Sequence, residues 1–488
     1  MRILIKMAAV LMLAGCTTEM PTGSYDSLQT FRDSLAFGVF SELAQYDGPA
    51  RRPVVIVPGL LGSRLRNLDT GKVAWGEFSP RGFDDAFFRG LAFPMQNGRM
   101  LAAMRDRNVA DGMLLAAEIR ILGMSFESAG YAGLVDILKS AGYVTESDAM
   151  VAGHGHPTLF LFSYDWRRNP AENAVELAKF IDSKRDMLLD AYHKEYGPGD
   201  YDIRFDLIAH SMGGLVSRYY MMYGTEQPDT DGTPPPLTWA GARNLARVAI
   251  VATPNAGYLD TLLEMNGGLR LSEAAPLIPG AVLATMPSYY AMLPWSAAGG
   301  EVRNLHGDRL DMFDPAVWER YGWGLAGPAA APTLATLLPD VADPQARREI
   351  ALDHQKKCLA AASALRTALT VEADPPPWLQ VTMFAGDAVP TDSVAEASLA
   401  GGLRRVEFDA GDGKVLCSSV RADRFVDGPR GRRYDPEVRW DAMVYLPASH
   451  MGITNSSTFA SNLLSFLLLD PDDEDNPPPT ARRRRVNR

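Results

Sequence analysis

Short runs of apolar, mostly β-branched residues recur through the middle of the chain and predict buried strands. The first run covers residues 54–57, with the sequence VVIV, and Pro58 and Gly59 end it. A run without polar alternation is typical of a parallel strand that is covered on both faces. The other runs lie at residues 159–162, 205–208, 248–251 and 379–384.

Helical patterns separate these runs. The longest begins at Asn169 and Pro170, where proline suits a first helical turn, and ends at the turn-forming sequence YGPG of residues 196–199. The apolar residues on one face of this helix are Leu177, Ile181, Leu188 and Tyr192. Because strands and helices alternate, we expect an α/β fold with a mostly parallel, doubly wound sheet and right-handed crossovers.

Two long stretches do not follow this alternation. Residues 76–118 and 258–345 are rich in Met, Phe, Gly, Pro and Ala and show no clean periodicity. Long connections of this kind inside a compact domain are often functional lids or caps. We therefore expect one domain over residues 50–469, in which residues 76–118 form a lid and residues 258–345 form a cap.

The N-terminus has the pattern of a targeting segment. Residues 1–15 combine a charged start with a short apolar run, which is shorter than the roughly 20 residues that a membrane-spanning helix needs. The sequence LAGC at 13–16 resembles the bacterial lipobox, in which the cysteine is acylated. We therefore expect a lipoprotein signal peptide over residues 1–15 and a tether over 16–49. Lipidated Cys16 would attach the protein to the bacterial cell envelope, and we expect the outer membrane.

Composition and charge narrow the classes of function. The chain has 488 residues, of which 47% are hydrophobic and 22% charged, and its formal net charge is −11. This composition is globular, and no basic patch interleaved with aromatic residues appears in the body of the protein, which argues against a nucleic-acid partner. The tail at 470–488 is acidic and proline-rich and then arginine-rich, so we expect it to be disordered. Cys358 and Cys417 either pair or stay free, because sequence gives no distance between them.

The segment FDLIAHSMGGLV at 205–216 carries the clearest chemical signal. A predicted strand precedes Ser211 and a predicted helix follows it, which is the context of a Gly-x-Ser-x-Gly nucleophile elbow. The positions two before and two after the serine must be small in so tight a turn, and Ala209 and Gly213 meet that requirement. Ser211 is therefore the candidate nucleophile.

A serine nucleophile needs a histidine base, and the histidine needs a carboxylate that fixes its tautomer. In hydrolases with this elbow the chain order is Ser, then Asp or Glu, then His, which leaves His306, His354 and His450. His450 lies in a loop between a strand-like run at 443–446 and a helical pattern at 459–468, so it is the candidate base. We interpret His354 as a solvated residue of a helix.

Two aspartates are candidates for the acid. Asp412 is flanked by glycines that let the backbone turn a carboxylate into the site. Asp387 follows the strand predicted at 379–384. Local pattern alone does not separate them.

The loop after the first strand is the expected source of an oxyanion donor. Gly59 and Gly62 permit a close approach of the backbone to a substrate. We therefore predict that the backbone N–H groups of Leu60 and Met212 form an oxyanion hole.

The sequence predicts neither a metal site nor a cofactor. His154 and His156 have no third ligand at a useful spacing, and we interpret them as two exposed imidazoles of a turn. His210, next to the candidate nucleophile, is interpreted as a packed or lid-contacting residue.

These segments together resemble the lecithin:cholesterol acyltransferase family, which includes lysosomal phospholipase and phospholipid:diacylglycerol acyltransferase. The resemblance covers residues 53–468 and is carried by residues 53–65 (PVVIVPGLLGSRL), 164–167 (YDWR), 209–214 (AHSMGG), 389–391 (VPT) and 411–415 (GDGKV). It favours Asp412 over Asp387 as the acid. It also implies that Trp75 is an active-site tryptophan in the substrate pocket.

The sequence departs from the family at two places. Residues 76–118 lack the cysteine pair that braces the lid in animal relatives, so a lid here would be held differently or not at all. Lys414 stands where the family usually has threonine.

The resemblance implies an α/β-hydrolase core with a cap and a mobile lid. It also implies transfer of a fatty acyl group from a phospholipid, through an acyl-Ser211 intermediate, to water or an alcohol. The first alternative is a neutral lipase or carboxylesterase, which uses the same triad chemistry. The second is a catalytically silent envelope protein that grips lipid.

Overall fold

The computed structural model describes residues 48–77, 83–121, 124–152, 155–229, 231–271, 275–428 and 431–469. The predicted signal peptide, the lipidated Cys16, nearly all of the tether and the tail at 470–488 lie outside the described residues. Among the helices of the described ranges, none is both long and apolar enough to cross a membrane.

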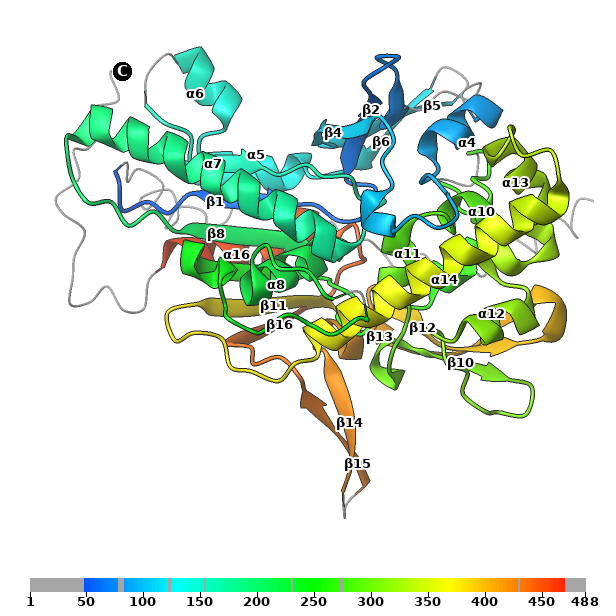
Figure 1. The fold of residues 1–488 in the computed structure, drawn as a ribbon. Coiled ribbons are helices and arrows are strands. Elements are labelled where there is room, and N and C mark those ends of the chain that lie inside the picture. The colour runs from blue at the N-terminus through cyan, green and yellow to red at the C-terminus, as the bar shows by residue number, and fades with distance from the viewer. Residues whose placement is uncertain are drawn as a thin grey trace, which may run out of the picture.

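A six-stranded parallel sheet forms the centre of the molecule (Figure 1). Its strands, in their order across the sheet, are β16 (Ala442–Leu446), β11 (Gln380–Gly386), β9 (Leu245–Val251), β8 (Phe205–His210), β1 (Val54–Val57) and β7 (Leu159–Leu161). All neighbouring pairs are parallel. The α/β fold with a mostly parallel, doubly wound sheet is thus confirmed.

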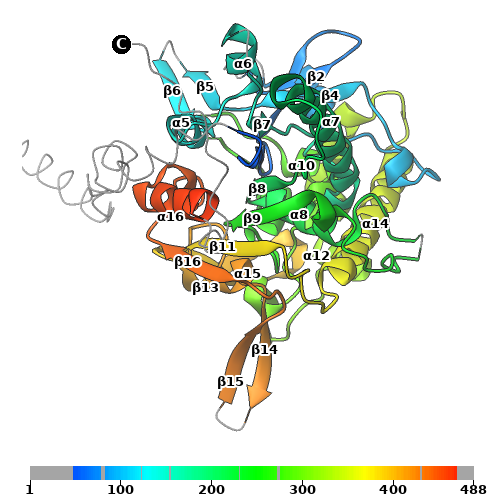
Figure 2. The same ribbon diagram turned by 90° about the vertical axis from the view of Figure 1, so that its left-hand side faces the viewer.

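Helices cover both faces of this sheet, which explains why its strands are continuously apolar (Figure 2). On β1, Val55 and Val57 pack in one core cluster with α7 (Pro170–Tyr196) and α8 (Met212–Tyr223). Val54 and Ile56 point the other way and pack with α5 (Ala132–Ser140) and α16 (Ser457–Leu468). All four side chains are completely buried.

Helix α7 begins and ends where the sequence predicts. The side chain of Asn169 accepts a hydrogen bond from the Ala171 N–H and caps the helix, and Pro170 occupies its first position. Gly197, with φ of 92°, follows its last residue.

The order of the strands places a topological switch between β1 and β8. From β1 the chain moves outward to β7 and then returns to the opposite side of β1 to form β8. In open α/β sheets ligands bind outside the carboxyl ends of the strands at such a point. The loop after β1 and the turn after β8 meet there.

The stretch predicted as a lid includes a helix and strands. Strand β2 (Ser63–Asn67) pairs antiparallel with β3 (Val73–Trp75) and with β4 (Asn108–Met113). Helix α4 (Asp85–Leu91) lies between β3 and β4 in the chain, and β5 (Ala116–Ile121) forms a hairpin with β6 (Met124–Ala129).

The stretch predicted as a cap folds into short helices beside the sheet. They are α9 (Asp260–Gly267), α10 (Gly280–Leu283), α11 (Pro287–Ala291), α12 (Pro315–Tyr321) and α13 (Ala331–Leu337), and the long helix α14 (Pro344–Leu369) packs against α11. The aromatic side chains Tyr289, Tyr290, Trp318 and Trp323 are buried between them. Residues 258–345 show no clean periodicity because their short helices are buried, and buried helices are apolar on most sides.

The remaining elements are peripheral. The other strands are β10 (Glu301–Asn304), β12 (Val389–Ala397) and β13 (Leu403–Gly411), which form one sheet, and the hairpin of β14 (Asp423–Gly428) and β15 (Gly431–Pro436). The other α-helices are α6 (Glu146–Ala152) and α15 (Cys417–Val420). The 3-10 helices are Leu101–Ala103, Gly241–Asn244, Ala297–Gly299, Gly324–Ala326, Pro328–Ala330, Leu399–Gly401 and Ile453–Asn455.

Two interpretations of histidines are wrong. His354 lies in a helix, α14, but it is completely buried, and its Nε2 lies 2.7 Å from the Thr285 carbonyl oxygen. His156 is also buried, and its Nδ1 lies 2.9 Å from Glu195 Oε2. His154 lies outside the described residues. Each buried ring makes a hydrogen-bond contact with a polar group on another element, and local sequence does not reveal such a distant partner.

Cys358 and Cys417, whose pairing the sequence leaves open, do not form a disulfide and are both free. Cys358 is buried in α14, and Cys417 makes a hydrogen bond to the Gly386 carbonyl oxygen.

Candidate functional site

The turn between β8 and α8 is a strained elbow with Ser211 at its tip. Ser211 has φ of 54° and ψ of −128°, a conformation that non-glycine residues rarely adopt. The turn is tight because α8 lies directly against the end of β1. A Cβ atom on Gly213 would lie 2.4 Å from the Val57 carbonyl oxygen, so only glycine fits there.

Three side chains that are far apart in the sequence meet at this elbow. His450 Nε2 lies 3.0 Å from Ser211 Oγ, and His450 Nδ1 lies 2.8 Å from Asp412 Oδ2. The Asp412 side chain is fully buried, whereas 14% of the His450 side chain is exposed. This is the geometry in which a base takes the proton of a serine hydroxyl while a carboxylate fixes the tautomer of the base.

The peptide around Asp412 fixes the orientation of its carboxylate. Its Oδ1 accepts hydrogen bonds from the N–H groups of Lys414 and Val415, at 2.9 and 2.7 Å, which leaves Oδ2 for His450. Gly413 has φ of 89°, and glycine adopts this value readily. The rival acid, Asp387, is exposed, and the structure shows no hydrogen bond between its carboxylate and His450.

The loop after β1, residues 58–62, lies against the elbow and is called the oxyanion loop below. A Cβ atom on Gly59 would lie 2.7 Å from Ser211 Cβ, which shows how closely the backbone approaches the serine. Within the described residues, the N–H group of Leu60 donates to no protein acceptor. The N–H of Met212 is the first of α8 and has no intrahelical acceptor. Two free donors therefore lie beside Ser211.

The YDWR segment at 164–167 supports the oxyanion loop from behind. Tyr164 Oη donates to the Pro58 carbonyl oxygen at 2.6 Å, and Trp166 Nε1 donates to the Ser63 carbonyl oxygen at 3.0 Å. Arg167 is completely buried and pairs with both Asp165 and Asp106. The segment therefore joins the loop, the sheet and the connection between α4 and β4.

Trp75 contacts the same loop. Its indole N–H donates to the Leu61 carbonyl oxygen at 2.9 Å, and its ring packs edge-on against Trp166. Only 2% of Trp75 is exposed. In this conformation Trp75 braces the oxyanion loop, and its assignment to a substrate pocket stays a prediction.

Two residues that sequence reasoning did not place in the site complete it. Tyr131, at the start of α5, and His210, at the end of β8, are buried behind Ser211 and His450. The sequence suggested that His210 is either packed or in contact with the lid, and the structure shows that it is packed. Burial lowers the pKa of His210 to about 3. No sequence signal marks Tyr131, because its partners are far away along the chain.

Lys414 connects the Asp412 turn to the cap. Its ammonium group lies 2.6 Å from Asp260 Oδ2 and 2.9 Å from Glu264 Oε1, both on α9. Burial opposes the charge of Lys414, but the carboxylates of Glu264 and Asp260 outweigh this and raise its pKa. Lys414, which stands where the family usually has threonine, thus pairs with two carboxylates of α9.

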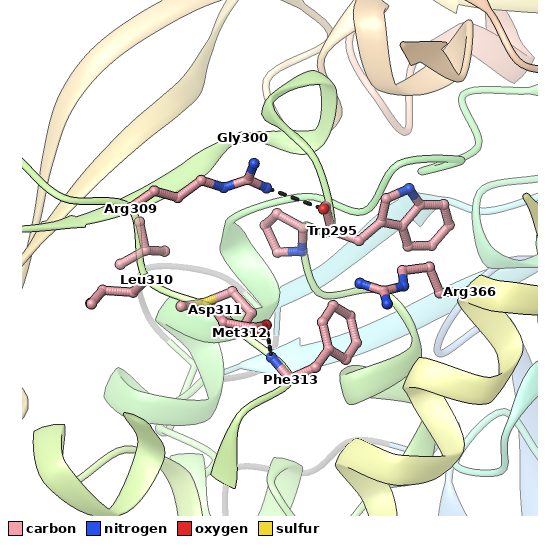
Figure 3. A pocket seen from close by; sticks show the side chains of 10 residues that line it. Trp295, Gly300, Arg309, Leu310, Asp311, Met312, Phe313 and Arg366 are labelled. Atoms are coloured by element: carbon pink, nitrogen blue, oxygen red, sulfur yellow. Dashed lines mark hydrogen bonds between the residues drawn. The ribbon is translucent and has the colours of Figure 1, made fainter. Parts of the chain in front are cut away.

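A hollow in the cap lies away from the elbow (Figure 3). It has a volume of about 300 Å³, and the side chains around it include Trp295, Phe313, Arg309 and Arg366. Ser211, Asp412 and His450 do not line it. In the described parts of the chain, no group of three or more His, Cys, Asp or Glu side chains is arranged to hold a metal ion.

Comparisons with known proteins agree with the fold. Residues 123–295 match the family model of lecithin:cholesterol acyltransferase. The crystal structure of the Tle4–Tli4 complex contains a chain with a TM-score of 0.53 and 14% identity over 86% of this chain and 98% of that chain. That likeness, with the parallel sheet, is the α/β-hydrolase fold that the sequence predicted.

Two further structures match with lower TM-scores. EstA from Clostridium botulinum matches with a TM-score of 0.26 and 14% identity, over 86% of this chain and 88% of EstA. Lipase 1 from Pelosinus fermentans matches with a TM-score of 0.27 and 13% identity, over 86% of this chain and 99% of the lipase. No curated protein matches this chain. The family match supports an enzyme of the lipid ester hydrolase or acyltransferase class.

Proposed function

From the assignment to the lecithin:cholesterol acyltransferase family, we propose that this protein cleaves a fatty acyl ester of a phospholipid through an acyl-Ser211 intermediate. The acyl group then passes to water or to an alcohol. The observation that carries the proposal is the continuous contact from Ser211 Oγ through His450 to Asp412, at 3.0 and 2.8 Å.

In the first half of the proposed reaction, Ser211 Oγ attacks the acyl carbonyl carbon and its proton passes to His450 Nε2. The negative charge that develops on the carbonyl oxygen is stabilised by the N–H groups of Leu60 and Met212. His450 then gives the proton to the departing alkoxide of the lyso-lipid, and the acyl group stays on Ser211.

In the second half, water or an alcohol attacks the acyl-Ser211 carbonyl while His450 accepts its proton. Collapse of this second intermediate returns the proton to Ser211 Oγ and releases a fatty acid or a new ester. Asp412 stays ionised throughout and stabilises the positive charge that forms on His450.

Substitution of the nucleophile tests the mechanism. Ser211→Ala should abolish covalent labelling by a fluorophosphonate probe and lower kcat for a chromogenic acyl ester by about 10⁴-fold or more. Ser217→Ala is the matched control, because Ser217 is another buried serine and lies in the helix that follows Ser211. Full activity in Ser211→Ala would overturn the proposed mechanism, and absent labelling of the unaltered protein would favour a silent lipid-binding protein.

The substrate class needs a separate measurement. Mass spectrometry of the products from a defined phospholipid, with and without a sterol or diacylglycerol, would identify the acyl donor and the acceptor. We expect lyso-phospholipid together with a fatty acid or an acylated alcohol. Turnover of triacylglycerol or simple esters without turnover of phospholipid would instead establish the neutral lipase or carboxylesterase alternative.

We also propose that Cys16 carries a lipid that holds the enzyme at the membrane of the bacterial envelope. The support is the lipobox-like sequence at 13–16. A single acyl chain gives only marginal membrane binding, whereas several chains on one cysteine give stable attachment. The anchor would keep the site close to its lipid substrate.

A further inference from the structure

Buried hydrogen bonds connect the oxyanion loop to the loop that carries His450. The Gly59 N–H donates to Tyr131 Oη at 2.7 Å, and Tyr131 Oη lies 2.9 Å from His210 Nδ1. His210 Nε2 in turn lies 3.0 Å from the backbone carbonyl oxygen of His450. Tyr131 is 3% exposed and His210 is 1% exposed, so water does not compete for these contacts.

One arrangement of hydrogens satisfies all three contacts. The His450 carbonyl oxygen can only accept, so His210 Nε2 must carry the hydrogen. Nδ1 of the neutral ring is then an acceptor, and Tyr131 Oη donates to it while accepting from Gly59. The low pKa of His210, which burial causes, keeps the ring in this neutral form.

At one end, Tyr131 fixes the peptide plane next to the predicted oxyanion donor. The Gly59 carbonyl oxygen accepts a hydrogen bond from the Gly62 N–H at 3.1 Å. Because the C=O and N–H of a trans peptide point in opposite directions, the Leu60 N–H points out of this turn. The Gly59 N–H belongs to the preceding peptide, Pro58–Gly59, whose carbonyl oxygen accepts from Tyr164. Loss of the Tyr131 contact would release the N–H side of that peptide and allow the adjoining Gly59–Leu60 peptide, with the Leu60 N–H, to shift.

At the other end, His210 holds the backbone of the proposed base. The His450 N–H donates to the Asp412 carbonyl oxygen at 2.9 Å, and its own carbonyl oxygen accepts from His210. The backbone of His450 is thus fixed on both sides, which leaves its ring directed at Ser211 Oγ.

We propose that Tyr131 and His210 are positioning residues that hold the oxyanion loop and His450 in register around Ser211. The His210 ring packs against the His450 ring, but neither Tyr131 nor His210 makes a hydrogen bond to Ser211 Oγ or to a ring nitrogen of His450. The pair matters because a donor and a base that belong to different loops must both lie within a few tenths of an ångström of their working positions. This inference rests on the proposed function.

Tyr131→Phe tests it with the smallest change in shape. We expect kcat for an acyl ester to fall about 10- to 100-fold, as for a misplaced oxyanion donor, with KM changed by less than about threefold. The inhibition constant of a boronic acid that mimics the tetrahedral intermediate should rise by the same factor as kcat/KM falls. Rates are expressed per site that a fluorophosphonate probe labels to completion, so that unfolded protein does not count.

Tyr223→Phe is the matched control. Tyr223 is also buried, and its hydroxyl donates to the Ala368 carbonyl oxygen at 2.8 Å, so both variants lose a buried hydroxyl and the hydrogen bond that it donates. Tyr131→Phe also leaves the Gly59 N–H without its acceptor, so it should lose at least as much thermal stability as Tyr223→Phe, but only Tyr131→Phe should lose kcat. Equal kcat in the two variants, with the unaltered enzyme active, would overturn the inference and leave the proposed function intact.

A double variant tests whether the two residues act as one unit. His210→Gln removes the ring that joins Tyr131 to His450. If the pair acts together, Tyr131→Phe with His210→Gln should be little slower than the slower single variant. Fully multiplicative losses would show two independent effects and contradict the coupling. Failure of the proposed function is distinct, because the unaltered protein would then show no labelling of Ser211.

Discussion

Ser211 is held in a strained conformation by its neighbours. A backbone conformation of this kind costs about 1–3 kcal/mol, which the surrounding packing must offset. Gly213 and Gly214 allow α8 to lie against β1 and Thr253, since a Cβ atom on Gly214 would lie 1.9 Å from Thr253 Oγ1. The strain directs the hydroxyl out of the sheet toward His450, so stability is exchanged for a nucleophile that is positioned against its base.

Two buried histidines predict a loss of stability in mild acid. Burial lowers the pKa of His354 to about 4 and that of His210 to about 3, from 6.5. Below pH 6.5 the unfolded chain binds protons that the folded protein does not bind, so stability is fully present above that pH and falls as the pH decreases toward 4. Each histidine should lower the free energy of unfolding by about 2 kcal/mol at pH 5 relative to pH 8. Urea unfolding at pH 8, 6 and 5 measures this.

His354→Gln separates this effect from general acid unfolding. Glutamine does not titrate and can still donate to the Thr285 carbonyl oxygen, so the decrease between pH 8 and pH 5 should shrink by about 2 kcal/mol. His306→Gln is the control, since His306 is exposed. An unchanged pH dependence in His354→Gln would contradict the prediction.

At the residue scale, the sequence was sufficient to select candidate residues whose choice depends on chain order or on steric requirements. Ser211 follows from its small neighbours, and His450 follows from its place after the last strand. Asp412 and Asp387 could not be separated locally, because the deciding factor is which turn faces the histidine. Tyr131 gave no signal, since its contacts to Gly59 and His210 bridge 72 and 79 residues of chain.

At the scale of elements, the site is a meeting of loops that other elements hold in place. Tyr164 of the YDWR segment holds the oxyanion loop at Pro58, and Trp166 holds Ser63, the first residue of β2, directly after the loop. The strands of the sheet could be predicted because a strand buried on both faces is apolar throughout. The short helices of residues 258–345 could not, because their residues are apolar on most sides and they end within one or two turns.

Lys414 should act as a stabilising link between the acid turn and the cap. Lys414→Met would remove the cation that pairs with Glu264 and Asp260 on α9, and Asp260 would keep only the longer contact with Arg405, at 3.6 Å. Breaking a buried pair in this way costs several kcal/mol, but the Lys414 side chain is 40% exposed, so solvent screening reduces the cost to about 1–2 kcal/mol. Chemical denaturation measures the difference. Because the backbone N–H of residue 414 still binds Asp412, kcat should change by less than about threefold.

A double-mutant cycle assigns this cost to the ion pair. Glu264→Gln added to Lys414→Met should recover part of the lost stability, because one uncompensated charge is removed. Lys179→Met is the control, since Lys179 pairs with Glu176 on the surface and both side chains are more than half exposed. Equal losses in Lys414→Met and Lys179→Met would contradict the role of Lys414.

At the scale of the whole molecule, the switch between β1 and β8 decides where chemistry occurs. The carboxyl ends of these two strands bring the oxyanion loop and the Ser211 elbow together, and β13 and β16 lead to the turns that carry Asp412 and His450. A strand order that reverses creates a crevice at the carboxyl edge of the sheet, and the sequence, which predicted a parallel sheet but no strand order, did not locate it. Which side chains fill the crevice depends on packing between distant segments.

The proposed anchor predicts a dependence of activity on how the substrate is presented. Without the lipid of Cys16, the chain has no acyl group to hold it at a bilayer. We therefore expect the Cys16→Ala protein to appear in the soluble fraction and to hydrolyse a short-chain soluble ester at the rate of the unaltered enzyme. Its activity on dilute phospholipid vesicles should fall at least about tenfold, because attachment to the membrane surface raises the effective concentration of substrate. Metabolic labelling with an alkyne fatty acid identifies the modified residue, and Cys358→Ala is the control. Equal vesicle activity in Cys16→Ala would contradict the proposed anchor and show that the folded domain binds the membrane by itself.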